Sequence, residues 1–280
     1  MKLCDTFREL AYRTWGLLAE GRLHSVQLGE ETLTDLNTLT LRSHHTIEVR
    51  THLFDKRQER EVGADWEWWF TGPSGRWFGF RVQAKVIDYR SNQFKHLHYK
   101  PRRSRRWQCD NLIESCNVAQ PRPVPIYCLY SQWEPGAVEI PLHTTAGKCA
   151  VEFFGCALVS ALVVRGLCGT KRSPSRCGLN DVIPHAVPWH LLVCPSGSEA
   201  QDLPTQVCQR WRTDMLQVEN TFLSSLDGRF RRHLLQKRQE QQQIITSDES
   251  PSYIWKIERG EEPNELPSVR RVVIFRQHPS

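Results

Sequence analysis

The chain lacks any long apolar run. Its longest uncharged apolar stretch, 153–164, covers 12 residues before Arg165 interrupts it, whereas a membrane-spanning helix needs about 20 residues. Near the N-terminus, Asp5, Arg8 and Glu9 fall where a signal peptide would need an unbroken apolar segment. We therefore expect no membrane partner and no secretory leader, which predicts a cytoplasmic protein.

Several motifs of enzymes and metal sites are also missing. None of the ten cysteines forms the C-x-x-C spacing that is typical of zinc ribbons and thioredoxin-like proteins. The sequence contains no G-x-S-x-G, no phosphate loop ending in G-K-[ST] and no H-E-x-x-H. Cysteines such as Cys128 and Cys194 lie inside apolar runs, so we expect reduced thiols that pack as small hydrophobic groups.

The composition is that of an ordinary globular protein with a modest basic excess. The 280 residues include 37 Lys or Arg and 31 Asp or Glu, a net charge of +6, which permits a polyanionic partner without requiring one. Ten tryptophans and eleven phenylalanines are enough for a sizeable core. We expect an N-terminal helix (1–27) that packs on a core (28–135), and a C-terminal α+β extension (136–280) that either belongs to the same domain or follows it.

Hydrophobic periodicity predicts the elements of the first half. Helical spacing covers 3–20 and 30–41, and period-two alternation then predicts three strands, followed by a helix and a short apolar strand, at 45–53, 62–70, 78–86, 107–119 and 126–131. The order α-α-β-β-β-α-β combines an antiparallel meander with a helical crossover. This order predicts an α/β fold with a mixed central sheet flanked by helices.

The second half has a less distinct pattern. We expect one buried helix, a strand, a second helix, a polar helix or linker, and two paired closing strands, at 149–167, 188–195, 211–222, 231–243, 253–260 and 269–277.

Polar side chains on two neighbouring predicted strands are the candidates for chemistry. Asp65 opens one strand, and Gln83 and Lys85 lie two residues apart on the next, so the latter two project from the same face of the sheet. Metal-dependent phosphodiester hydrolysis needs oxygen ligands for a hard cation such as Mg²⁺ and a positive charge near the phosphate. These three residues supply both.

The blocks GADWEWWF and VQAK, in which Gln83 follows Asp65 by 18 residues, resemble the restriction endonuclease-like, PD-(D/E)XK nuclease superfamily, in its Mrr-like branch. The resemblance covers residues 28–131 and implies an α-β-β-β-α-β core. It implies that Asp65, Gln83 and a helix acid, Glu31, bind Mg²⁺ or Mn²⁺, and that Lys85 acts in catalysis. Gln83 is neutral where many relatives have a carboxylate, so the site carries less charge. The blocks GADWEWW, VQAK and PIYCLY are also similar to those of an uncharacterised bacterial family.

The resemblance implies a metal-dependent DNA endonuclease in prokaryotic defence against foreign DNA. Two alternatives stay open: an inactive nucleic-acid-binding module on the same fold, and a protein-interaction subunit of a defence complex; a homodimer is also open. Asp65 and Lys85 equally fit a cross-strand ion pair on a solvated face, worth roughly a few tenths of a kcal/mol. We expect Glu67 to be a surface charge, and Trp66 and Trp68 to lie in the core.

A basic run follows the second of these strands. Between Phe94 and Trp107 there is no acid, and six basic residues are present: Lys95, Lys100, Arg102, Arg103, Arg105 and Arg106. Such a run is usually a solvated loop, but beside a catalytic strand it would neutralise phosphates and steer DNA, or RNA, toward the site. Gln108, which opens the next helix, is a further candidate contact to nucleic acid. His96 and His98 have no nearby cysteine pair, and we expect them to be loop residues.

Overall fold

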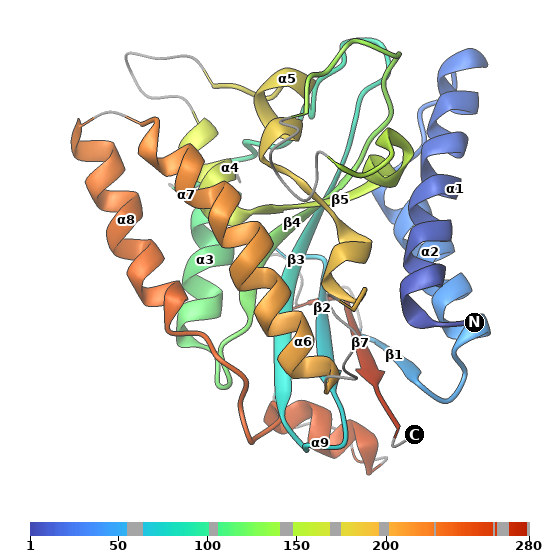
Figure 1. The fold of residues 1–280 in the computed structure, drawn as a ribbon, viewed down its shortest axis with the longest axis vertical. Coiled ribbons are helices and arrows are strands. Elements are labelled where there is room, and N and C mark those ends of the chain that lie inside the picture. Colours follow the sequence, from blue (N-terminus) through green and yellow to red (C-terminus); the bar gives the residue numbers. More distant parts are fainter. Residues whose placement is uncertain are drawn as a thin grey trace.

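A mixed sheet forms the centre of the protein. The computed structural model describes residues 1–54, 64–100, 106–140, 148–168, 175–195, 202–226, 228–259, 261 and 269–278. Within these residues the strands are β1 (Val49–Leu53), β2 (Trp66–Thr71), β3 (Trp77–Val86), β4 (Val124–Tyr130), β5 (Cys156–Ser160), β6 (Val187–Pro188) and β7 (Arg271–Arg276). The described strands form one seven-stranded sheet in the order β1-β7-β2-β3-β4-β5-β6 (Figure 1). The α/β class with a mixed sheet flanked by helices is therefore confirmed.

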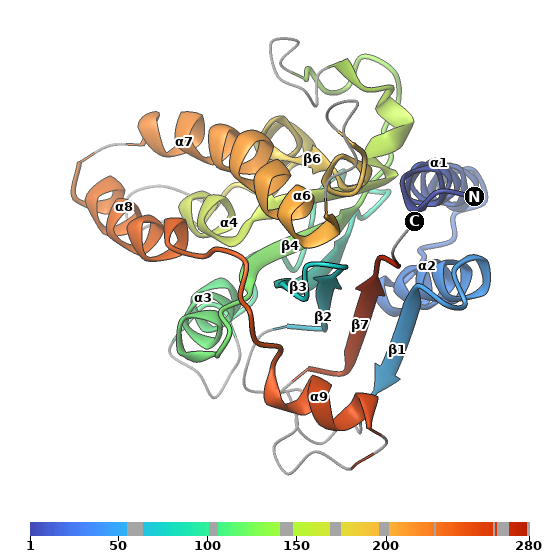
Figure 2. The same cartoon turned by 60° about the horizontal axis from the view of Figure 1, so that its bottom comes forward.

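Helices cover both faces of this sheet (Figure 2). They are α1 (Leu3–Leu23), α2 (Glu30–His44), α3 (Gln108–Val118), α4 (Ala161–Leu167), α5 (Leu179–Val182), α6 (Leu203–Arg210), α7 (Leu216–Ser224), α8 (Gly228–Gln242) and α9 (Ser252–Glu258), with a π-helical segment, Trp211–Met215, joining α6 to α7. Helices α1, α2 and α6–α7 pack on one face, and α3 and α9 contact the other. None of the described helices is long and apolar enough to cross a membrane.

Aromatic side chains fill the space between the sheet and α1. Phe7 of α1 contacts the rings of Trp68, Trp189 and Phe275 at centroid distances of 6.2, 4.8 and 5.8 Å. The indole N–H of Trp189 donates to the Phe7 carbonyl at 2.7 Å, so this buried polar group is satisfied. Trp66 and Trp68 are both buried, which confirms their predicted place in the core.

The C-terminal strand changes the predicted meander. β2 and β3 pair antiparallel and β3 and β4 pair parallel around α3, as the element order predicts. β1, however, does not pair with β2, because β7 lies between them, antiparallel to β1 and parallel to β2. The reason is burial: β7 is an almost continuous apolar run, which suits a central strand, whereas β1 is half polar and suits an edge.

Three predictions for the second half are wrong. Residues 149–167 form a short 3₁₀ helix (Val151–Gly155), β5 and α4 rather than one helix. Residues 188–195 are mainly a 3₁₀ turn, and 253–260 lie largely in helix α9 instead of a strand. Most of the first two segments, 154–164 and 188–194, is buried, so their apolar residues show no helical or strand period that could separate the two structures.

One pair of cysteines is joined. Cys4 of α1 and Cys194 form a disulfide across 190 residues, with their Cα atoms 4.8 Å apart, so the expectation of reduced thiols is wrong for this pair. The other eight cysteines are free.

Glu219 of α7 is a carboxyl buried against β5. It accepts a hydrogen bond from the Ser160 hydroxyl and lies 3.3 Å from Nε of Arg238. Burial raises the pKa of Glu219 to about 7, against the lowering effects of Ser160 and Arg238. The folded protein therefore keeps a proton that the unfolded chain loses near pH 4.5, and the free energy of unfolding falls as the pH rises between these values.

Glu219→Gln should remove this pH dependence, because the amide cannot ionise. Relative to wild type, the variant should gain on the order of 3 kcal/mol in free energy of unfolding between pH 4.5 and pH 8. Urea denaturation at both pH values measures the difference, with Glu249→Gln at an exposed position as the control. A difference between variant and wild type that does not change with pH would contradict the assignment.

Candidate functional site

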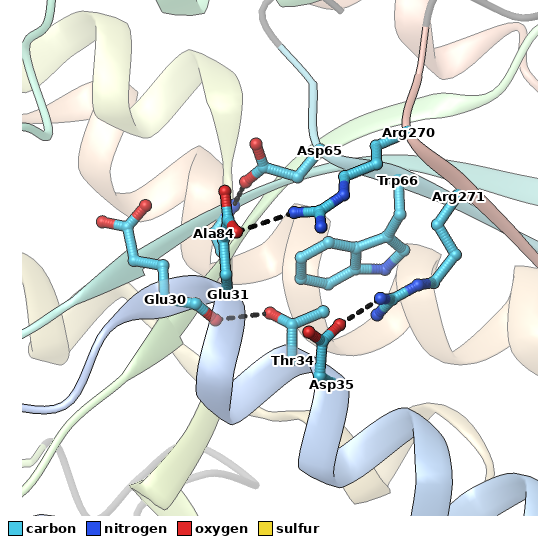
Figure 3. A pocket seen from close by; sticks show the side chains of 9 residues that line it. All are labelled: Glu30, Glu31, Thr34, Asp35, Asp65, Trp66, Ala84, Arg270 and Arg271. Atoms are coloured by element: carbon cyan, nitrogen blue, oxygen red, sulfur yellow. Dashed lines mark hydrogen bonds and ion pairs between the residues drawn. The ribbon is translucent and has the colours of Figure 1, made fainter. Parts of the chain in front are cut away.

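A small polar cavity opens where β2 and β7 begin and where α2 begins. Its volume is about 90 Å³. It is lined by Glu30, Glu31, Thr34, Asp35, Asp65, Trp66, Ala84, Arg270 and Arg271 (Figure 3). Four of these nine residues are acids and two are arginines, so the cavity brings together charges from three separate parts of the chain.

Asp65 is fixed by the strand that follows it in the sheet. Its Oδ2 accepts hydrogen bonds from the Gln83 side-chain amide at 2.6 Å and from the Ala84 backbone N–H at 2.7 Å. The Gln83 Oε1 in turn accepts from the Gln108 amide at 2.8 Å. The structure thus brings together Asp65, Gln83 and Gln108 in one hydrogen-bonded row, and Gln108 belongs to this row as the first residue of α3.

The Asp65 carboxyl is poised to change its charge near neutral pH. Burial raises its pKa to about 6, while Lys85 and the hydrogen bond from Ala84 act in the opposite direction. The nearby Glu30 raises the pKa further. A carboxylate whose charge is only partly compensated is a favourable place for a cation to bind.

Lys85 has a different partner from the one that the sequence suggests. Its side chain is buried, and its Nζ lies 3.6 Å from Oε2 of Glu30, the first residue of α2. Oε1 of Glu30 accepts from the Val86 backbone N–H at 3.4 Å. A solvated Asp65–Lys85 ion pair is therefore not what these residues form, because the charge on Lys85 is buried and faces Glu30.

Glu31 lines the same cavity but points to another partner. Its side chain is 68% exposed and its Oε2 lies 2.9 Å from the guanidinium of Arg270. Next to it, Arg271 pairs with Asp35 and donates to the Thr38 hydroxyl at 3.0 Å. Figure 3 shows both arginines reaching from the C-terminal strand toward α2, with the Trp66 indole between them.

Sequence reasoning missed Glu30, Arg270 and Arg271 as members of the site. Glu30 differs from the predicted Glu31 by one position, and helical periodicity does not decide which of two adjacent residues at a helix start turns toward a strand. No sequence pattern identifies Arg270 and Arg271 as members of the site, because their place there depends on β7 lying next to β2.

Glu67 is buried, so the prediction that it is a surface charge is wrong. It forms an ion pair with Arg81 at 2.7 Å and accepts from the Trp69 indole at 2.8 Å and from the Tyr253 hydroxyl. Arg81 also donates to the Ser115 carbonyl of α3 at 2.8 Å. These bonds attach α3 and α9 to the sheet beside the Asp65 row.

The described part of the basic run carries less unpaired charge than its sequence suggests. Lys95 pairs with Asp88 at 2.6 Å, Arg106 pairs with Glu114, and the Lys100 ammonium lies 5.6 Å from the centre of the Trp107 ring. The other predicted contacts, Arg102, Arg103 and Arg105, lie outside the described residues.

The donor set of the cavity fits a hard divalent cation. Mg²⁺ is commonly bound by one or two carboxylates, with waters and substrate oxygens completing its shell, and Asp65 and Glu30 offer two carboxylates. No group of three or more His, Cys, Asp or Glu residues in the described part of the chain could hold a metal ion, so an all-protein cage is not formed there. The buried Oε1 of Gln108 has no hydrogen-bond partner within the described residues, which leaves one oxygen of the row available.

The fold and the site define an α/β protein with a buried carboxylate–amide row at an acid-lined cavity. The chain belongs to a family of unknown function (DUF6615), whose profile matches residues 3–280. No curated protein matches the chain.

Substitution of the two neighbouring acids separates their roles. Glu30→Gln removes the charge that faces buried Lys85, and we expect the affinity for Mn²⁺ to fall about tenfold or more. Glu31→Gln removes one half of an exposed pair, whose contribution is small, so the affinity should stay within about fivefold of wild type. Titration calorimetry with Mn²⁺ measures both, and the reverse order would show that Glu31 is the acid of the site.

Proposed function

We propose that the protein is a divalent-metal-dependent nuclease of the restriction endonuclease-like superfamily. The observation that carries the proposal is the meeting of Asp65 and Glu30 at one cavity, where Gln83 bonds to Asp65 and Lys85 lies 3.6 Å from Glu30. The order α2-β1-β2-β3-α3-β4 with parallel β3 and β4 supports it as well. The intervening β7 is a departure from a simple meander, and it adds two arginines without separating the four residues.

The residues have distinct roles in this proposal. Asp65 and Glu30 would hold Mg²⁺ or Mn²⁺. The amide oxygen of Gln83, which accepts from Gln108 in the structure, would be a third donor once turned toward the ion. A bound Mg²⁺ supplies Lewis-acid polarisation of the phosphate and a more acidic water. The Lys85 ammonium, held by Glu30 at 3.6 Å, stabilises negative charge on the phosphate oxygens during hydrolysis. Gln108 orients Gln83 through their hydrogen bond at 2.8 Å.

DNA is the proposed substrate. The net charge of +6 is compatible with a polyanion, and Arg270 and Arg271 place two guanidinium groups beside the acids of the cavity. Guanidinium groups bind phosphate with two parallel hydrogen bonds. If phosphate oxygens replaced Glu31 and Asp35 as the partners of these arginines, the sugar–phosphate backbone of the DNA would lie next to Asp65.

Cleavage of circular double-stranded DNA in Mg²⁺, with EDTA as a blank, tests the proposal. Asp65→Asn keeps the size of the side chain but removes its charge, and we expect the cleavage rate to fall by at least about 100-fold while DNA binding persists. Lys85→Ala should lower the rate by about 100- to 1000-fold.

The matched control is Asp248→Asn, since the Asp248 side chain is 90% exposed and lies outside the cavity. It should cut DNA at the wild-type rate. Wild-type protein that binds DNA but never cuts it would favour the inactive binding module. An Asp65→Asn variant with full activity would remove Asp65 from the proposed site.

A further inference from the structure

Two thiols and an imidazole form a second polar cluster, which begins one residue after Gln108. Cys109 is the second residue of α3, and Cys168 caps the C-terminus of α4. Their sulfur atoms are 3.8 Å apart, and both side chains are buried. Arg165 of α4 pairs with Asp110 of α3 at 2.8 Å, which holds the two helix ends together at this point.

His98 is oriented to act on Cys168. Its Nε2 lies 2.8 Å from the Arg176 carbonyl oxygen, which can only accept, so Nε2 carries a proton and donates it. This leaves Nδ1, 3.1 Å from the Cys168 sulfur, to accept the thiol proton. His98 is half-exposed, so the cysteine pair lies one side chain below the surface.

The two thiols differ in acidity. Hydrogen bonding with Cys109 and then with His98 lowers the pKa of Cys168, whereas the hydrogen bond with Cys168 raises the pKa of Cys109. The charged groups around them are His98, Arg165 and Asp110. A thiolate next to a protonated thiol is the arrangement of an attacking and a resolving cysteine.

We propose that Cys109 and Cys168 are a redox-active dithiol that hydrogen peroxide oxidises to a disulfide, with His98 as the base for Cys168. The Cys168 thiolate attacks one peroxide oxygen, an S–O bond forms, the O–O bond breaks, and the leaving oxygen takes the proton from His98 to become water. The Cys109 sulfur then attacks the sulfenic acid, an S–S bond forms, and the S–O bond breaks. The second water leaves with the Cys109 proton, so two thiols are oxidised and one molecule of hydrogen peroxide is reduced.

Disulfide formation would displace Gln108, the member of the Asp65 row that lies next to Cys109. The sulfur atoms must close from 3.8 Å to about 2.05 Å, which draws the first turn of α3 toward α4. Gln108, the residue before Cys109, donates to Gln83 at 2.8 Å. This consequence rests on the proposed nuclease site: the oxidised protein should bind Mn²⁺ about fivefold more weakly, and a thiol reductant should restore the affinity.

Peptide mapping of the full-length protein tests the dithiol directly. The protein is treated with equimolar hydrogen peroxide, unfolded in an alkylating agent and digested, and we expect a peptide that links Cys109 to Cys168. Cys149 and Cys177 are internal controls, because both are less buried than the pair. Oxidation of these two while Cys109 and Cys168 stay reduced would overturn the proposal.

Variants then separate the dithiol from the nuclease proposal. His98→Gln should slow formation of the disulfide at least about tenfold, and Cys109→Ser should leave Cys168 as sulfenic acid, which a dimedone probe detects. Cys177→Ser should behave as wild type. Peptide mapping requires no nuclease activity, so it tests the dithiol proposal independently of the nuclease proposal. A disulfide that forms without any change in Mn²⁺ affinity would overturn only its coupling to Gln83.

Discussion

Glu67 and Arg81 are charged residues buried on one face of β2 and β3, and the groups that compensate their charges determine how helices pack around the site. Glu67 is fully buried between Arg81, Trp69 and Tyr253. An unpaired carboxylate in such a place would cost several kcal/mol, so the bonds to Glu67 and Arg81 determine where α9 and α3 contact the sheet. Once α3 is attached there, its first residue, Gln108, reaches Gln83.

Asp65, at the end of the row formed with Gln83 and Gln108, is also a largely buried carboxyl, but its charge is compensated less completely than that of Glu67. Asp65 accepts two hydrogen bonds, but it has no ion pair with a neighbouring cation among the described residues, and burial raises its pKa to about 6. Lys85, which lowers that pKa, is held by Glu30 instead. The charge of Glu67 is therefore balanced within the protein, whereas the charge of Asp65 is only partly balanced. This is the arrangement expected where a bound ligand supplies the missing charge.

The sequence predicts the local parts of this arrangement well. Period-two alternation places Gln83 and Lys85 on one face, and the order of elements gives the mixed α/β sheet. It does not predict contacts that depend on distant pairing. The place of β7 beside β2, the arginines it brings, and the disulfide between Cys4 and Cys194 join segments more than 180 residues apart. Glu67 was misjudged because alternation identifies a face of a strand but not the helix that covers it.

Anomalous scattering from Mn²⁺-soaked crystals of the full-length chain tests the central claim most directly, because it locates the cation without assuming any substrate. We predict a peak at the Asp65 carboxylate, next to Glu30, with the Gln83 side-chain oxygen turned toward it. A peak elsewhere, with Asp65 still accepting hydrogen bonds from both Gln83 and Ala84 and no density at the cavity, would contradict the account.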